Sequence, residues 1–229
     1  MPRPLGLTRV AIIEDHRLFA ESLDVALTLE GHDVHRVPLP TGPHATDTVL
    51  TTTLRLRPQV VLLDLDLGPT GRGTTLVRPL AQAGIAVVVV TAERDPARWG
   101  ECLLLGARTV LDKSEPLNTI LATIRRTGEG RALLPPDQRA RLIGYHRAEE
   151  AVNGRTRERL DGLTPRERVV LGELMAGRPV REISQRFVVS EATVRTQVKS
   201  VLAKLEVTSQ LAAVGAAHRA GWRPPDQPD

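Results

Sequence analysis

Residues 190–205 read SEATVRTQVKSVLAKL, and this stretch decides how the C-terminal part of the chain folds. At helical spacing its apolar side chains share one face, which must pack against other elements. That face consists of Val194, Val198, Val201, Leu202 and Leu205. The other face carries two cations one turn apart, Arg195 and Lys199. Ser190 is a favourable N-cap, and Glu191 suits the positive end of the helix dipole.

A shorter helix is predicted just upstream, at residues 180–187 (VREISQRF), and residues 188–190 join it to the long one. Two helices joined by so short a turn are typical of the helix-turn-helix, whose second helix enters the major groove of DNA. The pair by itself also fits an ordinary helical bundle. Ile183, Val189 and Val194 are the expected internal packing points.

Capping signals delimit further helices on both sides. Residues 164–167 (TPRE) offer a capping residue, proline at N1 and glutamate at N3, and Gly177 can close the helix that they open. Ser209 can begin a last helix, which Gly221 ends. Its surface of small residues fits either a dimer contact or packing within its own domain. These residues are Ala212, Ala213, Gly215, Ala216, Ala217 and Ala220.

Residues 163–207 (LTPRERVVLGELMAGRPVREISQRFVVSEATVRTQVKSVLAKLEV) closely resemble the four-helix DNA-binding domain of LuxR/NarL-type transcription factors. The resemblance extends to about residue 221 and implies that Arg195 and Lys199 face the groove of double-stranded DNA. Gln197 departs from the family, which often has histidine there, so the preferred DNA sequence is expected to differ. The resemblance places four side chains near the phosphate backbone, namely Thr193, Gln197, Ser200 and Lys204.

Composition narrows the class of protein. A chain of 229 residues suits one large or two small domains. Without an apolar run of membrane-spanning length or an N-terminal signal, we expect a cytoplasmic protein with no membrane partner. The single cysteine, Cys102, excludes an internal disulfide and is expected to be a buried small hydrophobe. Ten basic and seven acidic residues lie from position 164 onward, whereas residues 1–127 hold fourteen of each, so the basic excess favours DNA binding at the C-terminal end.

The N-terminal half alternates short Val/Ile/Leu runs with amphipathic segments, which predicts a parallel sheet covered by helices on both faces. The expected strands are residues 9–14, 33–37, 59–63, 85–90 and 108–111. The expected helices are residues 16–30, 45–56, 74–83, 96–105 and 116–127. In the first of these helices Leu18, Leu23, Leu27 and Leu29 are available for burial.

Ligands of such sheets bind outside the carboxyl ends of the strands. Taken singly, a polar residue at a strand end is an ordinary solvated residue. Here the ends carry Glu14, Asp15, Asp64, Thr91 and Lys113, and Lys113 is one of only three lysines in the chain, with Lys199 and Lys204. Together they indicate Mg²⁺-assisted phosphoryl transfer, in which carboxylates hold the ion, one carboxylate attacks phosphorus, and lysine and threonine meet the phosphoryl oxygens.

Residues 8–127 are similar to response-regulator receiver domains, whose CheY-like fold is an α/β doubly wound, parallel five-stranded sheet of order 2-1-3-4-5. The resemblance implies a sensor histidine kinase as partner and Asp64 as the phosphoacceptor. It implies that Glu14 and Asp15 hold Mg²⁺ together with Asp64 and the backbone carbonyl of Asp66. Two residues complete the implied set: Thr91 as the switch hydroxyl and Lys113 as the phosphate-contacting lysine.

The match has two departures. Val110 stands where many receivers carry the aromatic residue that turns inward on activation, and Leu67-Gly68-Pro69 replaces the usual Met-Pro. Phosphorylation could therefore signal through a different movement. Alternatively, the receiver could be a phosphorylation-independent platform for a protein or small ligand on the same DNA-binding regulator.

An enzymatic reading starts from Asp64-Leu65-Asp66, which resembles the DxD nucleophile motif of haloacid-dehalogenase-type phosphohydrolases. Those enzymes need a further acidic pair downstream of the lysine. The pair at Glu14 and Asp15 lies upstream, and no Asp-Asp follows Lys113. We therefore expect a regulator rather than an enzyme.

The expected organisation is a receiver at residues 1–127, a linker at 128–162 and a small all-α four-helix DNA-binding domain at 163–229. The linker is predicted to hold a helix at 137–152 and a flexible polar stretch at 153–159 (NGRTRER), and the tail from residue 224 is predicted to be disordered. A homodimer would meet two half-sites on palindromic or directly repeated DNA.

Overall fold

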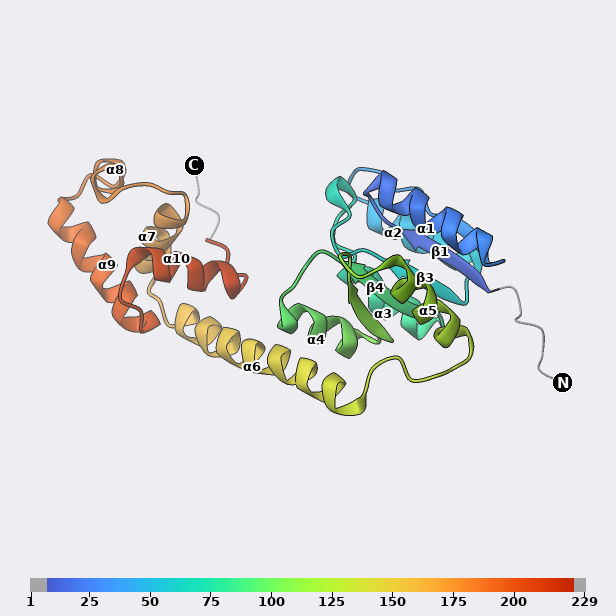
Figure 1. The fold of residues 1–229 in the computed structure, drawn as a ribbon. Helices are drawn as coiled ribbons and strands as arrows, with labels where there is room; N and C mark the ends of the chain where they lie inside the picture. The colour runs from blue at the N-terminus through green and yellow to red at the C-terminus, as the bar shows by residue number, and fades with distance from the viewer. Residues whose placement is uncertain (1–7, 225–229) are drawn as a thin grey trace. The chain divides into compact units, whose positions relative to one another are not determined.

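The computed structural model describes residues 8–224, so most of the tail predicted to be disordered lies outside the described residues. The chain divides into two compact units, Met1–Arg147 and Ala148–Asp229, which are described separately below (Figure 1). Within residues 8–224, no helix combines the length and the apolar character that crossing a membrane requires.

The first unit is built on a five-stranded parallel sheet of order β2-β1-β3-β4-β5, which confirms the predicted topology. The continuous Val/Ile/Leu runs form its central strands because both faces of these strands are buried. The strands are β1 (Arg9–Ile13), β2 (Asp33–Arg36), β3 (Val60–Leu63), β4 (Ala86–Thr91) and β5 (Thr109–Asp112).

Helices cover both faces of the sheet, and alternate residues of each strand point to opposite sides. Val10 and Ile12 of β1 pack with α1 and α5, whereas Ala11 and Ile13 pack with α2, α3 and α4. The helices are α1 (Arg17–Leu29), α2 (Ala45–Leu56), α3 (Thr74–Gln82), α4 (Pro96–Leu105) and α5 (Leu117–Gly128), with a short 3-10 turn, η1, at Gly68–Thr70. Cys102 is fully buried, as predicted.

One detail of the α1 prediction is wrong. Leu23 and Leu27 are buried, but Leu18 and Leu29 are 70% and 83% exposed. Positions 23 and 27 lie one turn apart on the face toward the sheet. Positions 18 and 29 are turned by well over 90° from that face at 100° per residue, so both point to solvent.

Helix α6 (Pro136–Asp161) spans the boundary between the two units. The predicted flexible stretch at 153–159 is wrong, because these residues continue the helix. Contacts within the second unit hold them: Asn153 is 7% exposed, and the Arg157 Nε donates to the Ala220 carbonyl oxygen at 3.0 Å. Local composition favours a loop here, and tertiary contacts override it.

The second unit adds four helices, α7 (Pro165–Met175), α8 (Val180–Arg186), α9 (Glu191–Leu205) and α10 (Gln210–Arg219). The capping box of α7 forms between Thr164 and Glu167, and Ser190 caps α9 by accepting from the Thr193 N–H at 3.1 Å. The predicted stripe of α9 is buried, except that Leu202 is half-buried. Its buried members are Val194, Val198, Val201 and Leu205.

The small residues of α10 serve mainly to pack this helix within its own unit. Ala213 and Ala217 are fully buried, and Ala220 is nearly so, in one core with α7 and α9. Three of the small residues remain half-buried: Ala212, Gly215 and Ala216.

The core of the second unit generates a stability prediction. Leu171 of α7 is 0% exposed, so Leu171→Ala leaves a cavity and is expected to lower the free energy of unfolding by about 2–5 kcal/mol. Urea denaturation followed by Trp222 emission, in a Trp99→Phe background, measures it because Trp222 packs on the same core. Leu211→Ala, at a side chain 82% exposed, is the control and should change stability by less than about 0.5 kcal/mol. Equal losses would contradict this packing.

Candidate functional site

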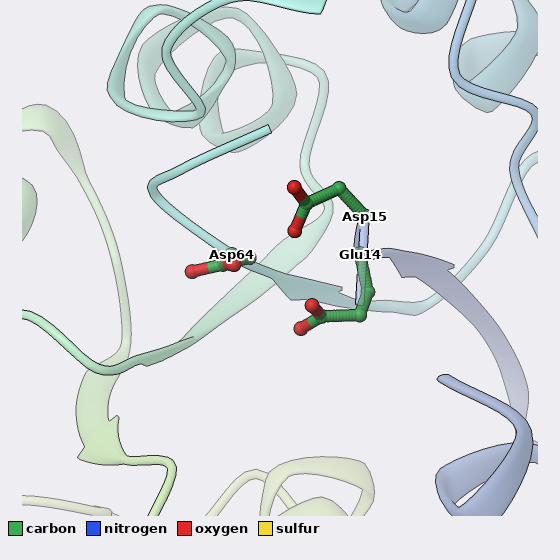
Figure 2. A group of neighbouring side chains, drawn as sticks. All are labelled: Glu14, Asp15 and Asp64. Atoms are coloured by element: carbon green, nitrogen blue, oxygen red, sulfur yellow. The ribbon is translucent and has the colours of Figure 1, made fainter. Parts of the chain in front are cut away.

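The five polar residues singled out at the strand ends meet at one edge of the sheet. Parallel strands in register end together, so the residues after β1 and β3 become neighbours although about fifty positions separate them. Glu14 and Asp15 follow β1, and Asp64 follows β3 (Figure 2). Thr91 is the last residue of β4, and Lys113 follows β5.

The Lys113 ammonium lies between two carboxylates. Its Nζ is 2.7 Å from Glu14 Oε1 and 2.7 Å from Asp64 Oδ2. The Glu14 and Asp64 side chains are 3% and 4% exposed, so water compensates their charges poorly and the lysine does so instead. Lys113 also lies 5.2 Å from the centre of the Phe19 ring, a cation–π contact that further fixes its position.

This arrangement shifts two pKa values. Burial raises the pKa of Glu14, although the hydrogen bond from Lys113 partly opposes the shift. Burial by itself would lower the pKa of Lys113, but its hydrogen bonds to Asp64 and Glu14 outweigh burial and raise it. The raised pKa of Lys113 favours a charged lysine at the centre of the cluster.

The carboxylates form a donor set that fits a small hard cation. One oxygen from each of Glu14, Asp15 and Asp64 lies within 4.8 Å of the others (Figure 2). Asp15 is exposed, which leaves its oxygens accessible from the cleft. Mg²⁺ is typically held by one or two carboxylates with further oxygen ligands, and the residues present match that requirement.

Thr91 is buried beside the cluster, and its hydroxyl accepts a hydrogen bond from the Glu93 N–H at 3.1 Å. Val110, at the position of the usual aromatic, is 6% exposed within the core. Gly73 brings the start of α3 against the backbone of Asp64 and Leu65, just after β3. A Cβ at this position would lie 1.9 Å from the Asp64 carbonyl oxygen, so a glycine is required there.

The site occupies a cleft of about 820 Å³ that also contains residues missed by the sequence reasoning. They lie on loops and helices rather than at strand ends, so strand spacing gave no signal for them. The additional lining includes His16, Arg72, Glu93 and Arg98.

The predicted DNA-contacting residues lie on α9, on the two sides that flank its buried stripe: Arg195 and Lys199 on one side, and Thr193, Gln197, Ser200 and Lys204 on the other. Thr193, Arg195 and Lys199 are exposed, while Gln197 is half-buried. The Arg195 side chain is 67% exposed and pairs with Glu191 one turn earlier at 3.2 Å. The turn before α9 contains Val188, a 91% exposed residue with a φ of 52°. Because their side chains are exposed, Arg195 and Lys199, the two cations expected to face the groove, are accessible to a ligand.

The other two predicted contacts, Ser200 and Lys204, are engaged within the unit. Both reach Glu167 of α7: the Ser200 hydroxyl donates to Oε1 at 2.5 Å, and the Lys204 ammonium donates to Oε2 at 2.7 Å. Glu167 also accepts from the Thr164 N–H at 2.7 Å, so one carboxylate joins the capping box to α9. The capping-box pattern marked Glu167 as a local residue but gave no sign of its link to α9.

These contacts control the pKa of Glu167. Desolvation by burial alone would raise it, but the hydrogen bonds from Lys204, Ser200 and Thr164 prevail and lower the pKa to about 2. A carboxylate with a lowered folded-state pKa stabilises the fold above its usual value of 4.5, and that stabilisation is lost as the pH falls toward 2.

Two family models match the chain, one in each unit. Residues 10–125 match the response regulator receiver domain, and residues 161–217 match the model described as bacterial regulatory proteins, luxR family.

Several known proteins align over most of their length. The transcriptional regulatory protein DesR of Bacillus subtilis (strain 168) is 26% identical, covering 93% of this chain and 98% of DesR. The DNA-binding transcriptional activator DevR/DosR of Mycobacterium tuberculosis is 30% identical, covering 74% of this chain and 77% of that protein. A structure of the RcsB response regulator of Salmonella typhimurium shares the fold, with a TM-score of 0.52, 21% identity, and coverage of 92% and 99%.

The Glu167 contacts predict a pH-dependent stability. Glu167→Gln removes the charge that holds Lys204, and it should lower the free energy of unfolding at pH 7 by about 1–3 kcal/mol. The difference from wild type should shrink as the pH falls from 4.5 toward 2, because Glu167 of the unfolded chain then binds a proton that the folded protein, with its pKa of about 2, does not. Urea denaturation from pH 7 to acid tests both statements. Glu158→Gln, at an exposed position of α6, is the control. If the difference in free energy of unfolding between wild type and Glu167→Gln did not change with pH, the lowered pKa of Glu167 would be contradicted.

Proposed function

The chain belongs to the response regulators that join a receiver domain to a LuxR-type DNA-binding domain, and from this membership we propose that phosphorylation of Asp64 controls DNA binding by α9. It is a DNA-binding transcriptional response regulator, not an enzyme. The observation that carries the proposal is the Lys113 ammonium, 2.7 Å from both Glu14 and Asp64 beside the exposed Asp15.

The chemistry follows from this geometry. An Asp64 carboxylate oxygen forms a bond to phosphorus while the bond from phosphorus to the donor's leaving group breaks, and the leaving group takes the electron pair. Glu14, Asp15, Asp64 and the Asp66 carbonyl would hold Mg²⁺, which neutralises charge on the phosphoryl oxygens when bound. Lys113, already at Asp64 Oδ2, then contacts a phosphoryl oxygen.

Thr91 completes the response to phosphorylation. Its hydroxyl is buried in the same cleft and can donate to a phosphoryl oxygen on Asp64. The phosphoryl group carries roughly −1.5 to −2 charges in place of the single negative charge of the Asp64 carboxylate, at a position where one ammonium now balances two buried carboxylates. Such a change in charge favours a rearrangement of the groups around it.

We assign the receiver to residues 1–127, the linker to 128–162 and the DNA-binding domain to 163–229. The proposed phosphodonor is a sensor histidine kinase, and the proposed DNA-bound state is a homodimer on two half-sites. Since chromosomal DNA is the proposed target, the proposed location is the cytoplasm.

On DNA, Arg195 and Lys199 are proposed to meet base edges, with Thr193 and Gln197 near phosphates. Lys204 can hold a phosphate as well as Glu167, because an ammonium has three donors and the structure uses two, on Glu167 and the Gly162 carbonyl. Ser200 has one hydroxyl hydrogen, so donation to a phosphate requires release from Glu167.

Phosphorylation is tested by intact mass. Incubation with acetyl phosphate and Mg²⁺ should add one phosphoryl group to wild type, and Asp64→Asn should abolish the addition because an amide is not a nucleophile of this kind. Asp47→Asn, at a side chain 82% exposed on α2, is the matched control and should be modified like wild type. An unmodified wild type would instead favour the phosphorylation-independent receiver, which Val110 supports.

The role of α9 is tested with DNA selected from a random pool by the protein. Lys199→Ala should weaken binding by about 1–3 kcal/mol, measured by fluorescence anisotropy, because it removes a groove-facing cation. Arg219→Ala, an exposed cation in the last turn of α10, is the control and should bind nearly as wild type does. Unchanged binding by Lys199→Ala at low salt would contradict the placement of α9 in the groove.

A further inference from the structure

Helix α6 approaches α4 so closely that their backbones touch. Gly100 of α4 is buried, and a Cβ built on it would lie 2.1 Å from the Leu142 carbonyl oxygen and 3.0 Å from the His146 Cβ. A side chain of any size is therefore excluded while α6 stays in place. The Leu142 side chain, 9% exposed, joins the same core as Leu103 of α4.

Arg139 adds a second attachment one turn earlier on α6. Its Nη2 donates to the Leu103 carbonyl oxygen at 2.8 Å, and its Nη1 donates to the Ala107 carbonyl oxygen at 3.2 Å. The Leu103 carbonyl oxygen also accepts from the Gly106 N–H at 3.3 Å, so the guanidinium adds a second hydrogen bond to an acceptor at the C-terminal end of α4. Residues 136–147 are thus fixed to α4 by one backbone contact, one apolar side chain and one charged donor.

The N-terminal part of α4 is linked to the phosphorylation cleft. The Glu93 N–H donates to the Thr91 hydroxyl at 3.1 Å, and the Trp99 Nε1 donates to the Glu93 carbonyl oxygen at 2.7 Å. Trp99 is half-buried and immediately precedes Gly100. Two hydrogen bonds on one residue, Glu93, therefore connect the cleft to the position where α6 touches α4.

We propose that the α4–α6 contact is a switch that phosphorylation opens. This proposal rests on the proposed phosphorylation of Asp64. When the Thr91 hydroxyl turns to the phosphoryl group, Glu93 and Trp99 move and α4 shifts. Residues 136–147 then separate from α4. At Gly100 the two backbones touch without a flexible side chain between them. No side chain can therefore adjust to a small displacement of α4, and such a displacement breaks the contact. This route leaves the cleft along α4 and does not need an aromatic residue at position 110.

Hydrogen–deuterium exchange of the full-length protein tests the switch. Exchange of residues 136–147 is measured before and after treatment with acetyl phosphate and Mg²⁺, and intact mass reports the extent of modification. We expect exchange about tenfold faster in the phosphorylated protein. A confirmed adduct with unchanged exchange would overturn the switch alone, whereas a missing adduct would overturn phosphorylation of Asp64, and the mass distinguishes the two.

Substitutions test the contact without phosphorylation. Gly100→Ala should speed exchange of residues 136–147 in the unmodified protein to the phosphorylated level. Gly144→Ala, whose added Cβ meets nothing within 4 Å, is the control on α6 and should not. Protection of β3 shows whether Gly100→Ala remains folded. If β3 loses protection in Gly100→Ala, the Arg139→Ala variant is used instead. This substitution removes the two hydrogen bonds of Arg139 to α4 and its following loop without adding an atom. Protection of residues 136–147 equal to wild type in the folded variant overturns the proposal.

The route through Trp99 has its own test. Trp99→Phe keeps an aromatic ring but removes the Nε1 donor to Glu93. We expect it to take up the phosphoryl group as wild type does and to lose most of the increase in exchange. An increase equal to that of wild type would show that Trp99 does not carry the displacement.

Discussion

The first unit depends on one ammonium placed between two buried carboxylates. Glu14 and Asp64 come from different strands, and the sheet brings their side chains together at an edge with little water. Without Lys113, the buried negative charges would repel each other and lack solvation, which is costly in a protein interior. In the reaction that we propose, the same lysine contacts the phosphoryl group, so the group that stabilises the resting state would also bind the product.

Glu167 has the reverse arrangement in the second unit, where one buried carboxylate gathers several donors. It closes the capping box of α7 and holds Ser200 and Lys204 of α9. The orientation of α9 relative to α7 therefore depends on a polar contact as well as on the valine and leucine stripe. Two of the residues predicted to reach DNA phosphates are thereby part of the domain's own structure, which links the stability of this unit to its binding surface.

Periodicity predicted the helices and strands, and strand-end spacing predicted that the polar residues after the strands would meet at one edge, because both depend on local pattern and on the rules of parallel sheets. They failed where tertiary contacts outweigh local preference. Residues 153–159 are polar and contain glycine, yet they are helical because Asn153 is buried and Arg157 binds the Ala220 carbonyl. Leu18 and Leu29 are apolar, yet they face solvent because the sheet covers only one side of α1. An apolar residue on an amphipathic helix therefore need not belong to the buried face of that helix.

The sequence by itself determined the alternation of strands and helices, the acidic cluster with its lysine, and a helix with one apolar face and a second face that carries Arg195 and Lys199. These follow from residue type and spacing along one chain. Only the tertiary structure decided which partners those residues take: Lys113 between Glu14 and Asp64, Lys204 on Glu167, and Leu142 against Gly100. The last two contacts join helices through side chains and backbone atoms that no periodic pattern relates, so they become visible only when the helices are packed.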